Sequence, residues 1–224
     1  MLVNPFTILQ PFADRVDVRL FRKHDAIATD DDVARETHAS ALASAQQVHG
    51  NVTAVIREPV TRCSGADGLI TDVPRLTLSM RSADCQTFVI YERKSNVVGL
   101  LHAGWRGLIR GAIPEFFRTL ESNWNILAKD AYVGAGPSLC QACAEFTDPV
   151  AELPGIPSRF FSGRHADLRG FADLQLMDAG VHRGRIERMQ DCTKCKNKLY
   201  WSYRGGDREK VLAGSENVLT ACLR

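Results

Sequence analysis

The chain has 224 residues, with 28 Lys and Arg against 26 Asp and Glu, a formal net charge of +2 and 45% hydrophobic residues. This length and composition are typical of one folded domain with its own core, and they exclude a disordered chain. There is no apolar run of about eighteen residues and no basic excess, so we expect neither a membrane span nor a nucleic-acid partner. At the N-terminus, Pro5, Pro11, Asp14 and Arg15 interrupt any signal-peptide core, so we expect a cytoplasmic protein.

The first half of the chain predicts helices and strands in no regular alternation. Acidic residues followed by alanines predict a helix over residues 30–46. Runs rich in β-forming residues, separated by turn residues, predict five strands: 52–56, 68–73, 76–80, 87–92 and 97–104. Apolar periodicity then predicts a second helix over residues 108–122, which Pro114 should kink or delay.

The second half adds further elements of both kinds. In chain order we expect a strand that ends in a glycine turn, a long surface loop, a helix and two strands: 130–136, 152–169, 171–184, 185–190 and 199–204. This mixture predicts an α+β, or mixed α/β, fold in a single domain that covers residues 1–224.

Cysteine is the informative part of the composition. The seven cysteines are Cys63, Cys85, Cys140, Cys143, Cys192, Cys195 and Cys222. An odd number in a chain without an expected export signal argues against a disulfide framework. Core packing, metal binding and nucleophilic catalysis are the roles left to consider.

One constellation joins His49, Cys85 and His102. Each lies at the end of a predicted strand or beside a glycine, in the segments QVHG, ADC and HAGWRG. Two imidazoles and one thiolate form a three-ligand set that would leave a fourth zinc position open for water or substrate, as in catalytic sites. The alternatives are a turn or core role, and a pair in which Cys85 is the nucleophile and His102 the base.

A second constellation joins two C-x-x-C pairs, Cys140 with Cys143 and Cys192 with Cys195. Such pairs build four-cysteine zinc sites, but 48 residues (144–191) separate these two, more than the usual spacing. We expect these cysteines to pack in the interior, and a second zinc is the alternative.

Two further features concern the pocket. The glycine-rich segment 134–138 lacks a dinucleotide fingerprint, and Pro137 removes an amide donor, so we interpret it as a turn that lines a pocket. Arg106 is the candidate anion-binding residue, since a guanidinium can bind phosphate through two N–H groups. A structural ion pair is the alternative for it. No G-x-S-x-G motif is present, so Ser/His/Asp chemistry is not expected.

Seven motifs carry a resemblance to a known family: QVHGN (47–51), ADGLIT (66–71), SADC (82–85), HAGWRG (102–107), GAGPS (134–138), DCTKC (191–195) and WSYR (201–204). The chain resembles the YfiH/YlmD family, also called the laccase-domain or multicopper polyphenol oxidase domain family, which includes the human protein FAMIN. The match is strongest over residues 44–222, whereas residues 1–43 are divergent and shortened.

The resemblance implies a layered α/β/β/α sandwich with mixed sheets. It implies purine nucleoside phosphorylase activity, with adenosine deaminase and methylthioadenosine phosphorylase activity, on nucleosides and phosphate. The family's metal ligands fall on His49, Cys85 and His102, the same set reached from ligand chemistry. Zinc is the expected metal and copper the alternative.

The chain departs from the family's pattern at four places. VDVRLFRKHDAIATDDD stands where the family has GFSTR-like and GGVS-like stretches, and Gln86-Thr87 follows ADC where a residue and proline are usual. Arg204-Gly205 replaces a double arginine, and Cys143-Ala144-Glu145 replaces Cys-Tyr-Glu. These changes put substrate preference in question.

The expected catalytic residues are Cys85, His102, Asp84 and Arg106. Zinc-activated water would attack C6 of adenine while a carboxylate moves protons, and Asp84 is the nearest carboxylate in sequence. Asp84 has a structural alternative, since neighbours on a strand point to opposite faces. Arg106 would bind phosphate. Trp105 would stack on the base or pack in the core.

Three other functions stay open. A four-copper oxidase needs roughly two or three imidazoles per ion, and the chain has six: His24, His38, His49, His102, His165 and His182. A single copper would still permit laccase-like oxidation. A metal-free hydrolase would use Cys85 and His102, and a binding module would rest on the two C-x-x-C pairs.

Overall fold

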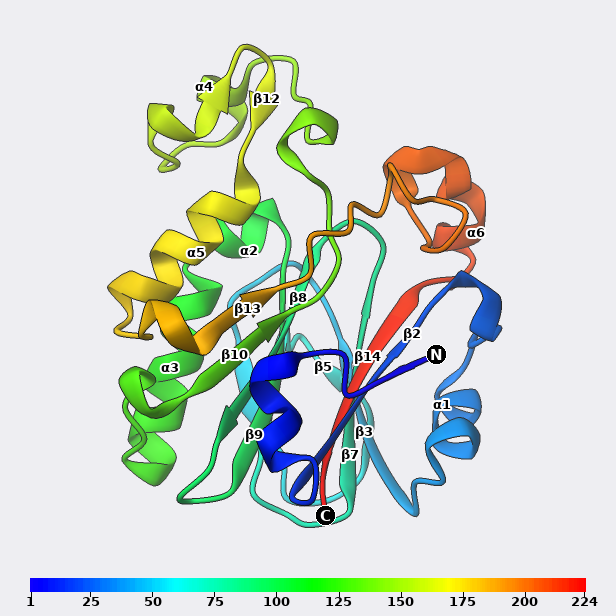
Figure 1. Cartoon of the computed structure of the whole chain (residues 1–224). Coiled ribbons are helices and arrows are strands. Elements are labelled where there is room, and N and C mark those ends of the chain that lie inside the picture. Colours follow the sequence, from blue (N-terminus) through cyan, green and yellow to red (C-terminus); the bar gives the residue numbers. More distant parts are fainter.

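Two six-stranded sheets pack face to face, with helices on both outer sides (Figure 1). The structure is a computed structural model that describes all 224 residues. The first sheet has the order β1-β2-β14-β7-β3-β5 and the second β13-β10-β8-β9-β6-β4. The strands of the first are Leu2–Val3, Val16–Phe21, Asn217–Leu223, Leu76–Ser82, Ala41–Gln46 and Val60–Ser64. Those of the second are Ile186–Arg188, Tyr132–Ala135, Gln86–Glu92, Val97–Ala103, Gly68–Thr71 and Thr53–Val55.

Both sheets are mixed. In the first sheet β3 runs parallel to β5 and β7, while β14 is antiparallel to β2 and β7. In the second, β8 is antiparallel to β9 and β10, whereas β10 and β13 are parallel. The carboxyl ends of β10 and β13 therefore leave the sheet at the same edge.

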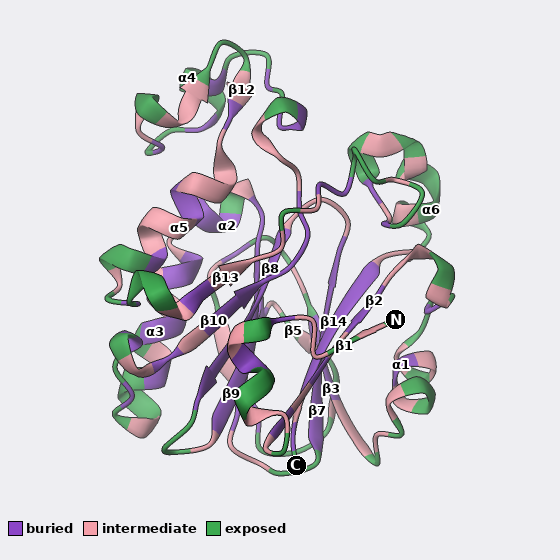
Figure 2. Cartoon of the chain, in the orientation of Figure 1, coloured by how far each residue is buried: buried purple, intermediate pink, exposed green.

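The core has three apolar layers. Side chains of β8 alternate between two of them: Phe88 and Ile90 face the helices beside the second sheet, and Val89 and Tyr91 face the first sheet. Because both faces of β8 and β9 are covered, every residue of these strands is buried, as their purple colour in Figure 2 shows. A smaller third layer lies against the opposite face of the first sheet.

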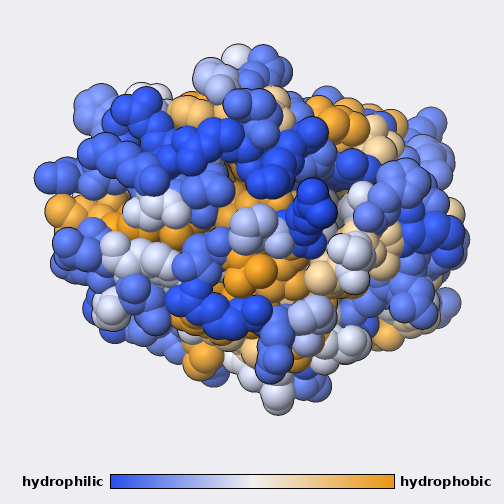
Figure 3. All heavy atoms as spheres, turned by 90° about the horizontal axis from the view of Figure 1, so that it is seen from below, coloured by the Kyte–Doolittle hydropathy of each residue, from blue (hydrophilic) through white to orange (hydrophobic).

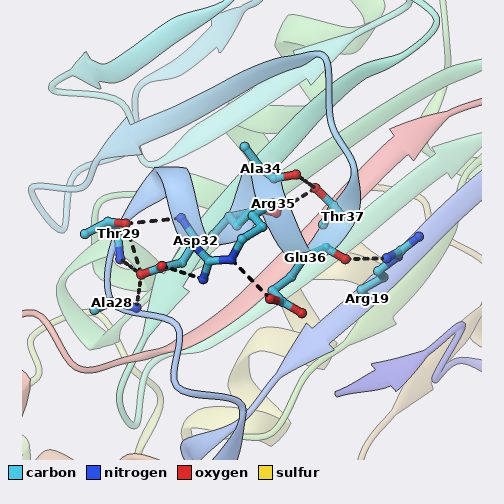
Figure 4. Close-up of polar contacts among 9 residues, drawn as sticks. Arg19, Ala28, Thr29, Asp32, Ala34, Arg35, Glu36 and Thr37 are labelled. Atoms are coloured by element: carbon cyan, nitrogen blue, oxygen red, sulfur yellow. Dashed lines mark hydrogen bonds and ion pairs between the residues drawn. The ribbon is translucent and has the colours of Figure 1, made fainter.

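The helices form the outer layers. α2 (Trp105–Ile109), α3 (Ala112–Trp124) and α5 (Leu168–Asp178) cover the second sheet and contribute apolar side chains to the largest core layer. α1 (Asp30–Thr37) covers the first sheet through Val33. A capping box begins α1: Asp32 N–H donates to Thr29 Oγ1 at 3.1 Å, and Thr29 N–H donates to Asp32 Oδ2 at 2.9 Å (Figure 4).

Short elements complete the chain. They are α4 (Pro149–Glu152), α6 (Arg208–Leu212), the hairpin β11 (Phe161–Ser162) and β12 (His165–Ala166), 3₁₀ turns at Thr7–Phe12, Lys23–Asp25, Ala128–Asp130, Gln141–Cys143, Ser158–Phe160 and Arg183–Arg185, and a π turn at Tyr203–Asp207. No helix is both long and apolar enough to cross a bilayer.

The predicted layered mixed α/β fold is confirmed, but several element assignments are wrong. The helix expected over 30–46 ends at Thr37, because His38 adopts φ 56°, and residues 41–46 form β3 instead. These residues pair with β5 on one side and with β7 on the other, and this pairing overrides the helix propensity of alanine. No strand forms at 199–204, where a turn leads to α6. The loop 152–169 contains short elements, and the helix predicted at 171–184 begins and ends earlier.

Pro114 does not kink the second predicted helix. That region instead holds two helices, α2 and α3, separated near Gly111, whose φ is +76°. Pro114 lies in the first turn of α3, where its missing N–H removes no intrahelical hydrogen bond. The strand at 130–136 is confirmed as β10, and the one at 185–190 as the shorter β13.

The two ends of the sandwich differ. At the upper end in Figure 1, two segments extend above the strands: one contains α4 and β12, and the other contains α6. The opposite end, seen from below in Figure 3, is largely hydrophilic with hydrophobic patches between the polar side chains. The predicted site residues lie at the upper end.

Candidate active site

Strand ends of both sheets meet at the upper end of the sandwich. β3 and β7 of the first sheet end there, and in the second sheet β9 ends and β8 begins there. The structure brings His49, Cys85 and His102 together at this point, with all candidate ligand atoms within 4.8 Å of one another. Segments far apart in the sequence thus form one cluster with the predicted composition.

Asp67 positions the loop of His49 and the ring of His102 by accepting hydrogen bonds from both. It is fully buried, and its carboxylate accepts the backbone N–H groups of Val48, His49 and Gly50 at 3.2, 3.0 and 2.7 Å. His102 Nδ1 lies 2.9 Å from Asp67 Oδ1. Because a carboxylate only accepts, Nδ1 carries the hydrogen, and Nε2 of His102 is left as the free ligand atom.

Gly104 leaves room for the cluster. A Cβ at this position would lie 2.7 Å from Cys85 Sγ and 3.1 Å from His49 Cδ2. Any side chain here would collide with two members of the trio. The glycine of HAGWRG therefore has a steric reason to be there, independent of its turn.

The pKa values of Cys85 and His102 are shifted in opposite directions. Burial disfavours the Cys85 thiolate, but the imidazoles of His102 and His49 outweigh burial and lower the pKa of Cys85 to about 6. Burial also disfavours the His102 cation, yet the Cys85 thiolate and Asp67 raise the pKa of His102 to about 9. Without a metal the pair is a thiolate and an imidazolium near neutral pH, and a bound cation would displace the imidazolium proton.

A cavity of about 580 Å³ opens above the cluster. Its wall comes from both sheets, from α2, from the segment after β10 and from α6. The charged side chains that line it are Arg62, Arg81, Asp84, Arg106, Arg204 and Glu216. A space of this size accommodates a small organic molecule.

Asp84 lies beside Cys85, and both oxygens of its carboxylate accept hydrogen bonds. Thr193 Oγ1 and Ser202 Oγ donate to Asp84 Oδ1 at 2.7 and 2.6 Å, and the N–H of Arg204 donates to Oδ2 at 2.7 Å. Its backbone has φ 87°, an unusual conformation for a residue with a Cβ. These bonds tie the Cys85 turn to two C-terminal loops.

Arg106 and Trp105 form one wall of the cavity. The Arg106 guanidinium lies 4.1 Å from the centre of the Trp105 ring, and Phe146 meets Trp105 edge-on with ring centres 6.2 Å apart. Trp105 is half-buried rather than a closed core residue. The cation and the ring are both presented to the cavity.

The four cysteines of the two C-x-x-C motifs also lie close together. The Sγ atoms of Cys140, Cys143, Cys192 and Cys195 all lie within 4.8 Å of one another. Cys63 and Cys222 lie outside both clusters, on β5 and β14.

Three residues of the site were missed by sequence reasoning. Asp67 stands in ADGLIT directly before the β-rich run that forms β6, and a carboxylate next to a buried strand needs internal partners, which is the signal that could have found it. Arg81 is 5% exposed, and its Nε and Nη1 have no partner. Glu216 lines the cavity and directly precedes β14, a strand that was not predicted from the sequence.

The fold and the site together define a layered α/β/β/α protein with a His–Cys–His cluster beneath a cavity. The chain belongs to the family described as multi-copper polyphenol oxidoreductase laccase, whose model matches residues 23–215. This confirms the membership inferred from the motifs.

Relatives of known name share part of the chain. It is 34% identical to the purine nucleoside phosphorylase YlmD of Geobacillus stearothermophilus over 154 residues, which are 64% of this chain and 56% of that one. It is 30% identical to adenosine deaminase RL5, from an unknown prokaryotic organism, over 163 residues, which are 66% and 60% of the two chains. The matches thus span less than two thirds of these relatives.

The structural likeness extends further. The crystal structure of YlmD from Geobacillus stearothermophilus superposes with a TM-score of 0.79 at 25% identity, covering 96% of this chain and 93% of that chain. YfiH of Bacillus licheniformis superposes with a TM-score of 0.74 at 23% identity, covering 86% and 78%. These superpositions place the chain in the same fold.

Proposed function

We propose that this chain is a zinc-dependent purine nucleoside phosphorylase that also deaminates adenosine and phosphorolyses methylthioadenosine. The observation that carries the proposal is the cluster of His49, Cys85 and His102 beneath a cavity. The names of the relatives support the choice of reaction.

The residues of the cluster fit a catalytic zinc ion. The donors are two imidazoles and one thiolate, a set that zinc accepts in open three-ligand sites. The carboxylate of Asp67 holds the tautomer of His102 that presents Nε2, as carboxylates behind zinc-ligating histidines do. When bound, zinc supplies Lewis-acid activation of water or of a substrate oxygen.

The phosphate subsite is assigned to Arg106. Its guanidinium is stacked on Trp105 and takes part in none of the ion pairs of the structure, so its N–H groups are available to an anion. Arg81 is a second cation at the cavity wall: its Nη2 pairs with Asp30 Oδ1 at 3.3 Å, whereas its Nε and Nη1 lack partners. Trp105 and Phe146 also line the cavity and offer apolar surface for the purine beside the cations Arg106 and Arg204, which lie over their rings.

Two carboxyls reach the cavity and are candidates for proton transfer. Asp84 stays the candidate expected from sequence, although its three hydrogen bonds favour a positioning role. Glu216 makes none of the side-chain hydrogen bonds of the structure, and burial raises its pKa despite Arg81 and the nearby imidazoles. Glu216 is therefore the better placed of the two to exchange a proton with a substrate.

Two alternatives are each favoured by one observation. The family's description favours a copper-dependent polyphenol oxidase, but a single cluster containing two histidines is no four-copper centre. The thiolate–imidazolium pair of Cys85 and His102 favours a metal-free cysteine hydrolase.

One variant separates these functions. His49→Ala removes a metal ligand but leaves Cys85 and His102 in place. The proposal predicts that zinc-loaded wild-type protein releases adenine or hypoxanthine from nucleosides only with phosphate, and that His49→Ala loses this activity. Full activity in His49→Ala would favour the hydrolase. Phenol oxidation only with copper, without nucleoside cleavage, would favour the oxidase.

A further inference from the structure

Two loops that carry the C-x-x-C pairs leave the second sheet side by side. β10 and β13 are parallel neighbours, and pairing continues beyond them through a bridge between Ser138 and Cys192. The N–H of Thr193 donates to the carbonyl of Ser138 at 3.2 Å, and that of Ser138 donates to Asp191 at 3.4 Å. The backbone thus brings together cysteines that are separated by 48 residues (144–191).

Each pair lies on a tight turn. The N–H groups of Cys143 and Ala144 donate to the carbonyl of Cys140 at 3.0 and 3.1 Å, and the N–H of Lys196 donates to the carbonyl of Cys192 at 2.9 Å. These turns direct both cysteines of a pair to one side. The four Sγ atoms all lie within 4.8 Å of one another, with Cys143 and Cys195 at 3.5 Å.

These separations match a tetrahedral site. With Zn–S bonds of about 2.3 Å, the sulfurs of a four-thiolate zinc site stand about 3.8 Å apart. In addition, the N–H of Cys140 donates to Cys192 Sγ at 3.3 Å, a contact that favours the thiolate form.

Core packing does not account for the cluster. Cys143 and Cys192 are buried, but Cys140 is half-buried and Cys195 is exposed. Cysteines that only fill a core are buried together. Arg169, Lys194 and Lys196 stand near these cysteines and would offset the negative charge of four thiolates around a divalent cation.

We propose that Cys140, Cys143, Cys192 and Cys195 bind one Zn²⁺ in a closed, structural four-thiolate site. This site is separate from the His49–Cys85–His102 cluster, and the proposal does not depend on the proposed function. It also replaces our expectation that these cysteines only pack in the interior.

The site would join the two loops that hold the Cys85 turn. The carbonyl of Asp84 accepts the N–H of Leu139 at 3.1 Å, next to Cys140. The carboxylate of Asp84 accepts Thr193 Oγ1 at 2.7 Å, next to Cys192. Beyond Cys143, the same segment continues to Ala144 and Phe146 in the cavity wall. The structural zinc would therefore fix one wall of the cavity.

Zinc counting tests the proposal without any activity assay. The double variant His49→Ala/Cys85→Ala empties the other cluster, so we expect it to retain one tightly bound zinc per chain after purification under reducing conditions. Adding Cys195→Ser, at the exposed ligand, should remove that zinc. Adding Cys63→Ser instead, at a cysteine outside the cluster, should leave it bound.

A spectroscopic measurement covers the case in which Cys195→Ser fails to fold. The double variant loaded with Co²⁺ should show the sulfur-to-cobalt charge-transfer and d–d bands of a tetrahedral thiolate site. The proposal is overturned by a zinc-free double variant, by a cobalt spectrum without thiolate bands, or by disulfides among the four cysteines in protein purified with reductant. It is also overturned if folded Cys195→Ser protein keeps its zinc.

Discussion

At the scale of single residues, the central relation is between a buried carboxylate and the cluster above it. Asp67 accepts three backbone N–H groups and one imidazole N–H, which is more than a neutral amide oxygen could satisfy. The residue thereby fixes both the loop of His49 and the ring of His102. Its importance follows from geometry, because the residue is no metal ligand itself.

Asp67→Asn should therefore weaken zinc binding at the cluster by about 10–100-fold, as loss of a carboxylate behind a ligating histidine does. Competition titration with a chromophoric chelator measures this affinity. Asp72→Asn is the matched control, since Asp72 follows the other end of β6 and bonds Trp124 and Arg57 instead. An affinity in Asp67→Asn equal to that of the control would contradict the role of Asp67.

The acidity of Cys85 gives a pH prediction for zinc-free protein. A thiol of ordinary pKa loses thiolate steadily below about pH 8.5. Because the imidazoles hold the pKa of Cys85 at about 6, its thiolate persists to about pH 6 and disappears below it. Alkylation of Cys85, followed by peptide mass spectrometry, should keep a constant rate from pH 8 to pH 7 and fall below pH 6.

The same experiment has an internal check. Zinc should protect Cys85 from alkylation, since a coordinated thiolate is a poorer nucleophile. A rate that drops tenfold for each pH unit below 8.5 would show that Cys85 lacks the imidazole partners seen here.

At the scale of elements, local sequence predicted some segments and failed where tertiary contacts decided. The central runs of β8 and β9 are rich in β-forming apolar residues because both faces of their sheet are covered, so these strands were recognised. Residues 41–46 are alanine-rich and were assigned to a helix, but their neighbours β5 and β7 pair with them on both sides. This pairing depends on the order of strands in the sheet, which the local sequence of residues 41–46 does not reveal.

The capping box of α1 gives a prediction at this scale. Thr29→Ala removes the acceptor of the Asp32 N–H, which should cost about 1 kcal/mol of unfolding free energy. For a chain of this size such a loss lowers Tm by about 2–4 °C. Calorimetry should show this shift, while Thr29→Ser, which keeps the hydroxyl, should match the wild type. Equal Tm values for both variants would contradict the capping contribution.

At the scale of the whole molecule, the site exists because two sheets end at the same place. The cluster of His49, Cys85 and His102 could be predicted from three sequence motifs, since each motif carries one of its members. The residues around the cluster could not be predicted in this way. The segments that carry Asp67, Arg81 and Glu216 meet only because of the order of the strands in the sheets, and the strand after Glu216, β14, was not predicted. The two cysteine pairs show the same limit, because their separation in sequence conceals adjacent loops.

Cleavage of adenosine and methylthioadenosine by the zinc-loaded chain, with and without phosphate, measures the proposed reaction itself. The purine base (adenine, together with hypoxanthine from deaminated adenosine) and the pentose 1-phosphate should form in equal amounts, only when phosphate is present, and Arg106→Ala should raise the KM for phosphate. A zinc-dependent phosphorylase is ruled out if zinc-loaded wild-type protein forms no pentose 1-phosphate, or if His49→Ala and Cys85→Ala cleave the nucleosides as fast as the wild type.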